Sequence, residues 1–142
     1  MSPDQIQQFF RNDRFAEHVG IELLDVGPGR ARARLEIEDR HLNAVGVAHG
    51  AAIFSLADLV FAVASNSHGS VALGVNVSVS FLKSAGRGPL VAKAEEVSIN
   101  PKLATYLIRV TDASEHLIAL FQGTVYRKKD PLADHLPSGA EG

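Results

Sequence analysis

One segment, residues 44–65, is almost entirely apolar and limits what this chain can fold into. It approaches the roughly 20 residues that cross a bilayer, but Asp58 lies well inside it and would cost about 2.5–3.5 kcal/mol in a membrane. Much of the rest is weakly hydrophobic Ala and Gly, and no Lys or Arg flanks it closely. A helix that is apolar all round can equally be buried inside a protein. We therefore expect a central helix enclosed by the rest of the chain, and no membrane partner.

The rest of the chain is large enough to enclose such a helix. The 142 residues, 46% of them apolar and 21% charged, fit one folded domain. A formal charge of −2 lacks the basic excess of a nucleic-acid-binding protein. Without cysteine there is no disulfide, thiolate metal site or cysteine nucleophile. The N-terminus has no basic stretch followed by an apolar one, so we expect no secretory signal and a cytoplasmic location.

The residues before the apolar segment predict a short helix and a β-hairpin. Ser2 begins a capping-box pattern, and the helix that it starts is expected to run to about Phe15. Residues 21–26 and 30–37 predict two strands joined by a turn of glycine and proline. In the second strand arginines alternate with apolar residues, so one face is solvated. Residues 40–49 have no sustained period and predict a loop.

The residues after the apolar segment alternate as strands do. The predicted strands are residues 71–81, 90–99, 105–111 and 117–126. Tight turns between them imply antiparallel neighbours. Little apolar material follows, so we expect a single domain over residues 1–128 and a mobile tail over residues 129–142.

These elements together predict an α+β fold in which one curved antiparallel sheet wraps around a long central apolar helix. Such a sheet covers the helix on one side only and leaves edge strands without partners. We therefore expect a homodimer.

Asp58 is the first candidate for chemistry, because an ionised carboxylate in an apolar helix is expensive to bury unpaired. One interpretation is a buried Asp that accepts hydrogen bonds from neighbouring backbone or Ser groups. The other is a base or nucleophile that faces a cleft.

The start of the apolar helix is the second candidate. Helix N-termini present free N–H groups and a positive dipole end, so Gly50 could donate its N–H to a developing oxyanion. An ordinary turn is the alternative. His49 could be a general base, but a lone His beside a helix start is more often a structural hydrogen-bonding group, and we assign it a supporting role.

Other site classes lack their motifs. The six His residues show no close pair at helical spacing for zinc, so we expect no metal. The chain has no Gly-x-Ser-x-Gly elbow, no phosphate loop and no dinucleotide fingerprint. Serine hydrolases, nucleoside triphosphatases and typical dehydrogenases are therefore disfavoured.

Residues 41–67 resemble the signature of hotdog-fold acyl-CoA thioesterases of the phenylacetic acid degradation type. The shared pattern is Asn43, Gly46 and His49-Gly50, with Asp58 eight residues after the last glycine. The predicted strand order also matches this family over residues 21–127. The resemblance implies a hotdog fold and hydrolysis of an acyl-CoA thioester, an aryl- or arylacetyl-CoA in this branch, without a cofactor, since coenzyme A is part of the substrate.

The resemblance also implies roles for individual residues. Asp58 would be the catalytic carboxylate and Gly50 the oxyanion donor, with Asn43 and His49 shaping the loop around the thioester. Asn76 lies where relatives often place a polar residue that positions water or the acyl group. Ala51 departs from the pattern, since relatives usually have a second Gly there; the extra methyl affects the shape of the acyl pocket more than activity.

The helical spacing adds an argument that does not depend on the family. Eight residues of helix span about 12 Å, too far for Gly50 and Asp58 of one chain to meet at one carbonyl carbon. If both act, they come from different subunits. This agrees with the expected dimer, or dimer of dimers, and with the paired sites of the family.

Binding of coenzyme A would require basic residues near the mouth of the cleft, because its nucleotide carries several negative charges. Lys83, Arg87 and Lys102 lie at predicted strand ends or turns and are our candidates, although each is by default a solvated surface charge. Two other functions stay open. A hotdog-fold hydratase or dehydratase would also use an acidic residue or His near the helix start, and a non-catalytic protein could bind acyl thioesters.

Overall fold

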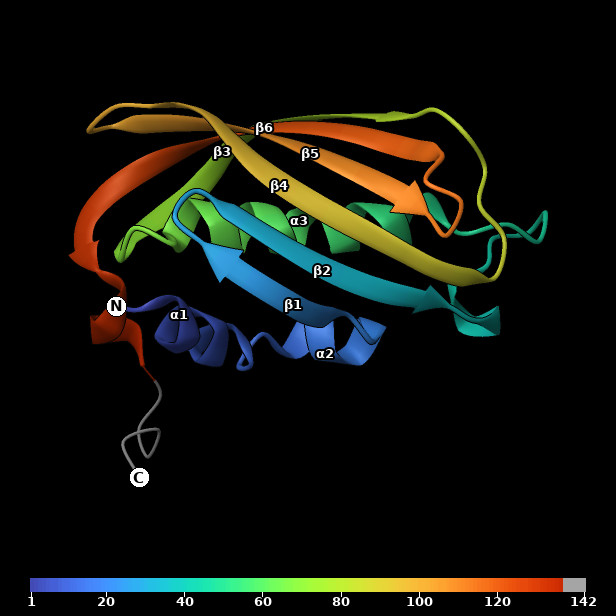
Figure 1. Cartoon of the computed structure of the whole chain (residues 1–142), viewed down its shortest axis with the longest axis horizontal. Helices are drawn as coiled ribbons and strands as arrows, with labels where there is room; N and C mark the ends of the chain where they lie inside the picture. The colour runs from blue at the N-terminus through green and yellow to red at the C-terminus, as the bar shows by residue number, and fades with distance from the viewer. Residues whose placement is uncertain (137–142) are drawn as a thin grey trace.

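The computed structural model describes residues 1–136, and its centre is the helix α3 (Gly50–Asn66). Leu56, Val60 and Val63 are fully buried along this helix. The sheet arches over one side of α3, while α1 (Pro3–Phe10) and α2 (Arg14–Val19) lie on the other side (Figure 1). Within residues 1–136, no helix combines the length and the apolar character that crossing a membrane requires.

The sheet has six strands in the order β1-β2-β4-β5-β6-β3, and all neighbours are antiparallel. The predicted α+β architecture, one curved antiparallel sheet around a long central helix, is confirmed. The strands are β1 (Glu22–Gly27), β2 (Arg30–Ile37), β3 (Ser70–Phe81), β4 (Gly88–Ile99), β5 (Leu103–Asp112) and β6 (Leu117–Pro131).

Strand β2 alternates as its sequence predicts. Its apolar residues, from Ala31 to Ile37, face α3 and are buried, while its arginines point outward. On the outer face Arg32 pairs with Asp25 of β1 at 2.6 Å and Arg34 pairs with Glu36. The arginines of this strand therefore form a solvated face of the sheet.

The predicted N-terminal helix is wrong in its length. The capping box at Ser2 is present, but α1 ends at Phe10 and a separate helix, α2, begins at Arg14. A new helix begins here because Asp13 caps α2: its carboxylate accepts the N–H of Ala16 at 2.9 Å.

The turn at residues 86–89 does not join neighbouring strands, contrary to our expectation. Strand β3 pairs with β6, whereas β4 lies between β2 and β5. The connection after β3 instead crosses the end of the sheet, where the carbonyl of Ala85 accepts the N–H of Ala48 at 2.7 Å. This contact fastens the loop before α3 to the connection between β3 and β4.

The boundary predicted at residue 128 is also wrong. Strand β6 continues to Pro131, and a short 3-10 helix, η2 (Leu132–His135), follows. Leu132 is 3% exposed and donates its N–H to the carbonyl of Gly69. Regular structure therefore continues beyond residue 128, and residues 137–142 of the predicted tail lie outside the described residues.

Candidate functional site

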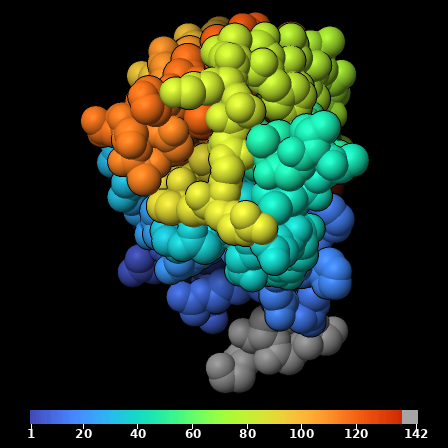
Figure 2. All heavy atoms as spheres, turned by 90° about the vertical axis from the view of Figure 1, so that its right-hand side faces the viewer, coloured from blue at the N-terminus to red at the C-terminus, as the bar shows by residue number. Residues whose placement is uncertain are grey.

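The loop before α3 is shaped by Asn43. Its side-chain oxygen accepts the N–H groups of Val45 and Val47 at 3.1 and 3.2 Å. Its own N–H donates to the carbonyl of Val47, and Gly46 takes a positive φ of 84° in between. Asn43 therefore folds the loop that delivers the chain to the start of α3. Figure 2 shows this loop beside the segment that follows β3.

His49 caps α3, because its Nδ1 accepts the N–H of Ala51 at 2.9 Å. The N–H of Gly50, one residue earlier, donates to no group within residues 1–136. A Cβ on Gly50 would lie 3.3 Å from the ring of Phe81, so glycine leaves room above this N–H. The first turn of α3 thus presents a free donor at the positive end of the helix dipole.

His41 anchors this loop to neighbouring segments through hydrogen bonds, a structural role that the sequence did not predict. The side chain is buried, its Nδ1 accepts the N–H of Glu38, and its Nε2 donates to the carbonyl of Val19 at 2.8 Å. Its carbonyl also accepts the N–H of His49 at 2.7 Å. The position of His41 at the start of the matched signature was the only signal, since the chain shows no pattern that marks a buried His.

Asp58 is not buried in the single chain, so that interpretation of its sequence is wrong. The helix turns its apolar residues toward the sheet, and Asp58 lies on the stripe of α3 that the sheet does not cover. Partial removal from water raises the pKa of Asp58, and the negative charge of Asp13 raises it further. A carboxylate with a raised pKa is a better proton acceptor than one in open water.

Two cavities flank Asp58. The first, here called the α2 cavity, has a volume of about 460 Å³ and separates α2 from α3. The second, the β3 cavity, has a volume of about 620 Å³ and separates α3 from β3. Asn76 lines the β3 cavity together with Asp58, and Ala51 lines the α2 cavity with it. The structure therefore places Asn76 and Ala51 on opposite sides of the same carboxylate.

The helix start and Asp58 do not meet in one chain. Neither Asn43 nor Gly50 lines either cavity beside Asp58, and His49 lines a neighbouring cavity of about 330 Å³ that it shares with Ala51. The two groups stay separated by the rise of α3, about 12 Å over eight residues.

The basic candidates lie at two ends of the sheet. Lys83 follows β3 near the helix start, and Arg87, in the same connection, pairs with Asp39. Lys102 lies in the turn between β4 and β5, and its carbonyl accepts the N–H of Arg127 at 2.7 Å. A single chain does not gather these three side chains. Within residues 1–136, no three His, Asp or Glu side chains lie together as metal ligands would.

Comparison with known proteins identifies the family. The model of the thioesterase superfamily matches residues 45–119, which include the helix start, α3 and strands β3 to β5. A protein of Archaeoglobus fulgidus, named only as an esterase candidate, is 47% identical over 119 residues, covering 83% of this chain and 77% of that one. The chain therefore belongs to the thioesterase superfamily, and it is a hotdog-fold thioester hydrolase.

The names of two further relatives mention a substrate or a bound ligand. The acyl-coenzyme A thioesterase PaaI of Escherichia coli K12 is 30% identical over 119 residues, covering 83% of this chain and 85% of that one. A solved structure of the E. coli PaaI protein superposes with a TM-score of 0.86 over 92% of this chain and 99% of its own. The structure of smu.793 from Streptococcus mutans UA159, bound to acetyl CoA, is 25% identical and has a TM-score of 0.75, covering 79% of this chain and 91% of its own.

Proposed function

We propose that this protein hydrolyses an acyl-CoA thioester, an aryl- or arylacetyl-CoA, to the free acid and coenzyme A. The observation that carries the proposal is Asp58, a single carboxylate on an otherwise apolar helix, with a cavity on each side of it. The α2 cavity contains the rings of Phe15 and Phe54, which suit an aromatic acyl group. The similarity to an acyl-coenzyme A thioesterase, PaaI of E. coli, supports an acyl-CoA substrate.

Asp58 would act in one of two ways. As a general base it takes a proton from water, whose oxygen attacks the thioester carbonyl. As a nucleophile it attacks the carbonyl itself and forms an anhydride, which water then hydrolyses. In both routes the C–S bond breaks and the CoA thiolate leaves and takes up a proton. The raised pKa of Asp58 favours either route at neutral pH.

Gly50 would stabilise the oxyanion of the tetrahedral intermediate through its free N–H. Because Gly50 and Asp58 of one chain are too far apart for one carbonyl, each site needs the helix start of a second subunit. The edge strand β3 supports such an assembly. Its side chains Leu73, Val75 and Val77 are 53%, 59% and 42% exposed, and within residues 1–136 no strand pairs with one edge of its backbone. A homodimer, or a dimer of dimers, follows from this proposal.

Coenzyme A would enter as part of the substrate and not as a cofactor. The acetyl CoA held by the S. mutans relative supports this substrate class. We assign its phosphates to Lys83, Arg87 and Lys102, which two chains could bring together although one chain does not. A cytoplasmic location is also part of this proposal.

The test is to mix the protein with a panel of aryl- and alkyl-CoA thioesters and to measure free coenzyme A by mass spectrometry. The wild-type protein should release coenzyme A, with the highest kcat/KM for an aryl or arylacetyl substrate. Asp58→Asn keeps the shape of the side chain but can act neither as base nor as nucleophile, so its turnover should fall by about 10²–10⁴-fold. A variant that keeps more than about a tenth of the activity would remove Asp58 from the mechanism.

A further inference from the structure

The short helix α2 is held firmly beside the exposed stripe of α3. Asp13 caps its first turn, and Gly20 ends it in a left-handed conformation with φ of 95°, its N–H bonding to the carbonyls of Ala16 and Glu17. Ala16 is buried in the core. With both ends capped and one face buried, α2 is a fixed wall for the α2 cavity.

Phe15 is the apolar part of this wall. The side chain is 66% exposed, and it lines both the α2 cavity and the adjoining cavity beside His49. Phe54, Leu59 and Ala62 complete an apolar lining below it. A large apolar side chain held over a concave apolar surface is typical of a small-molecule site.

The charge of the α2 cavity is negative. Its charged lining residues are Asp13 and Asp58, and no Lys, Arg or His of residues 1–136 lines it. The carboxylate of Asp13 is close enough to raise the pKa of Asp58. An acyl group that ends in a carboxylate would therefore meet two like charges and no compensating cation.

We propose that α2 determines the acyl specificity of the enzyme: Phe15 packs against an uncharged apolar acyl group, and Asp13 excludes acyl groups that end in a carboxylate. This inference rests on the proposed function, because it assigns the acyl group to the α2 cavity. It adds that the substrate is a monocarboxylic acyl-CoA and that dicarboxylic acyl-CoA thioesters are rejected.

The test compares hexanoyl-CoA with adipoyl-CoA, which differ at the far end of the chain by a methyl group against a carboxylate. Asp13→Asn removes the charge and keeps an oxygen that can cap α2. The ratio of kcat/KM for adipoyl-CoA to kcat/KM for hexanoyl-CoA should be at least about tenfold higher in this variant than in the wild type. In the wild type, the ratio of kcat/KM for hexanoyl-CoA to kcat/KM for adipoyl-CoA should also fall at high salt, because salt screens the repulsion between carboxylates.

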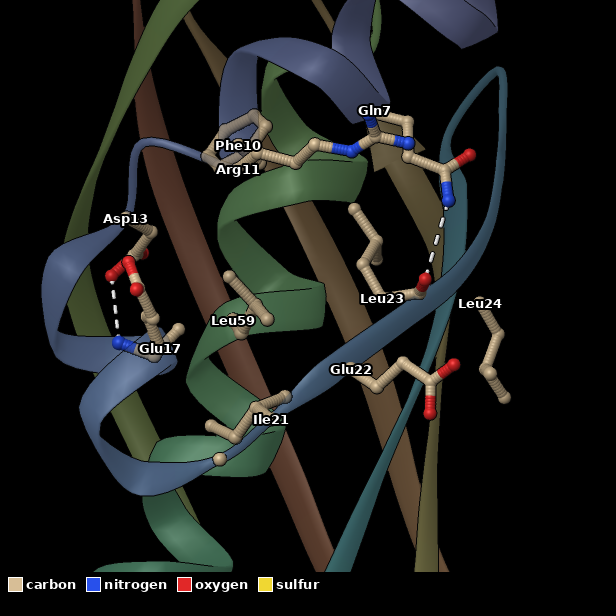
Figure 3. A pocket seen from close by; sticks show the side chains of 12 residues that line it. Gln7, Phe10, Arg11, Asp13, Glu17, Ile21, Glu22, Leu23, Leu24 and Leu59 are labelled. Carbon is tan, nitrogen blue, oxygen red and sulfur yellow. Dashed lines mark hydrogen bonds between the residues drawn. The ribbon is translucent and has the colours of Figure 1, made fainter.

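Glu17→Gln is the matched control. It removes the same charge, four residues away within α2. Glu17 lines the cavity between α2 and β1, where Figure 3 shows it with Gln7 and Ile21, and it does not line the α2 cavity. This variant should keep the wild-type ratio. Phe15→Ala should raise the KM for hexanoyl-CoA by a larger factor than the KM for acetyl-CoA, which has only a methyl group beyond the carbonyl.

The outcomes separate the two proposals. If the wild type hydrolyses no acyl-CoA, the proposed function is wrong and this inference falls with it. If hydrolysis occurs but Asp13→Asn changes both substrates equally, or Glu17→Gln changes the ratio as much, only the role of α2 is wrong. Circular dichroism melting of each variant identifies a loss of folding, and the substrate ratio, measured on the folded fraction, does not depend on it.

Discussion

The carboxylate of Asp58 lies on a helix whose neighbours are buried, and removal from water is the largest cause of its raised pKa. Asp13 adds to this effect from α2, whereas the β3 side of Asp58 carries no titratable side chain among the residues that line that cavity. Because the pKa is higher in the folded protein than in the unfolded chain, the folded state binds the proton more tightly. The ionised carboxylate therefore lowers the free energy of unfolding at neutral pH.

We predict that Asp58→Asn melts at a higher temperature than the wild type at pH 7. The difference should shrink as the pH falls through the raised pKa of Asp58 and should vanish below the ordinary Asp value of about 3.9, where both chains carry a neutral side chain. Calorimetric melting at several pH values measures this difference. A lower melting temperature for the variant at pH 7 would mean that the ionised Asp58 stabilises the fold.

Asp112 provides a control of opposite sign. The backbone N–H of His116 donates to its carboxylate and lowers its pKa. The ionised form of Asp112 therefore stabilises the folded protein above the ordinary Asp value, and this contribution is lost as the pH falls through the lowered pKa. Asp112→Asn should melt at the same or a lower temperature than the wild type at pH 7, never at a higher one.

At the scale of single elements, the start of α3 depends on a cap that is unusual in its chemistry. The Nδ1 of His49 occupies the place of the Ser, Thr, Asp or Asn oxygen that normally accepts such an N–H. A protonated ring would lose this acceptor, so the capping role requires neutral His49. A capped helix start keeps the N–H of Gly50 aimed in one direction.

We predict that His49→Ala lowers the free energy of unfolding by about 1 kcal/mol, the usual effect of removing a cap. His49→Asn supplies a capping oxygen and should restore both the stability and most of the kcat. If His49 were instead a general base, Asn would restore the melting temperature while kcat stayed about 10²–10⁴-fold low. Measuring kcat and melting temperature on both variants separates these two roles.

The elements that the sequence predicts correctly are those whose pattern is local. The alternation of β2 and the apolar run of α3 define their own buried faces, and the capping box at Ser2 is a short-range signal. The pairing of β3 with β6, by contrast, depends on contacts between distant residues that no local pattern encodes. The short helix η2 after β6 buries a single side chain, that of Leu132, and no local pattern marks it.

In the candidate site, too, the features that depend on contacts between distant residues could not be predicted from the sequence. Asp58 stands out in the sequence because a carboxylate interrupts an apolar run, yet its exposure depends on which stripe of α3 the sheet leaves uncovered. Asp13 gives no such signal, because it reads as one more acidic residue in a polar segment. Only the packing of α2 on α3 brings it to the cavity that Asp58 lines.

At the scale of the whole molecule, binding of coenzyme A should depend on basic side chains that two chains bring together. We predict that KM for an acyl-CoA rises with ionic strength, while KM for the matching acyl-pantetheine, which lacks the nucleotide, changes little. Lys83→Ala, Arg87→Ala and Lys102→Ala should each raise KM for the CoA substrate only. Lys93→Ala, on the exposed outer face of β4, is the control. Equal salt dependence for both substrates would contradict the assignment.

The proposed active site requires a dimer, because its Gly50 and its Asp58 come from different subunits. Gly50→Pro removes the donor N–H at the first residue of α3, where proline suits the backbone because the preceding His49 is already extended, with ψ of 138°. The added Cβ would lie 3.3 Å from the ring of Phe81, which is 52% exposed and has room to move away. This variant and Asp58→Asn should each be inactive alone.

Mixing the two variants under subunit exchange should restore activity. A mixed dimer has one site that carries both substitutions and one site that carries neither. With random pairing, about half of the dimers are mixed, so the activity should recover to about a quarter of the wild-type value. Native mass spectrometry measures the fraction of mixed dimers in the same sample. If mixed dimers form and the activity does not return, either Gly50 and Asp58 serve one site within a chain or Gly50 is not the oxyanion donor.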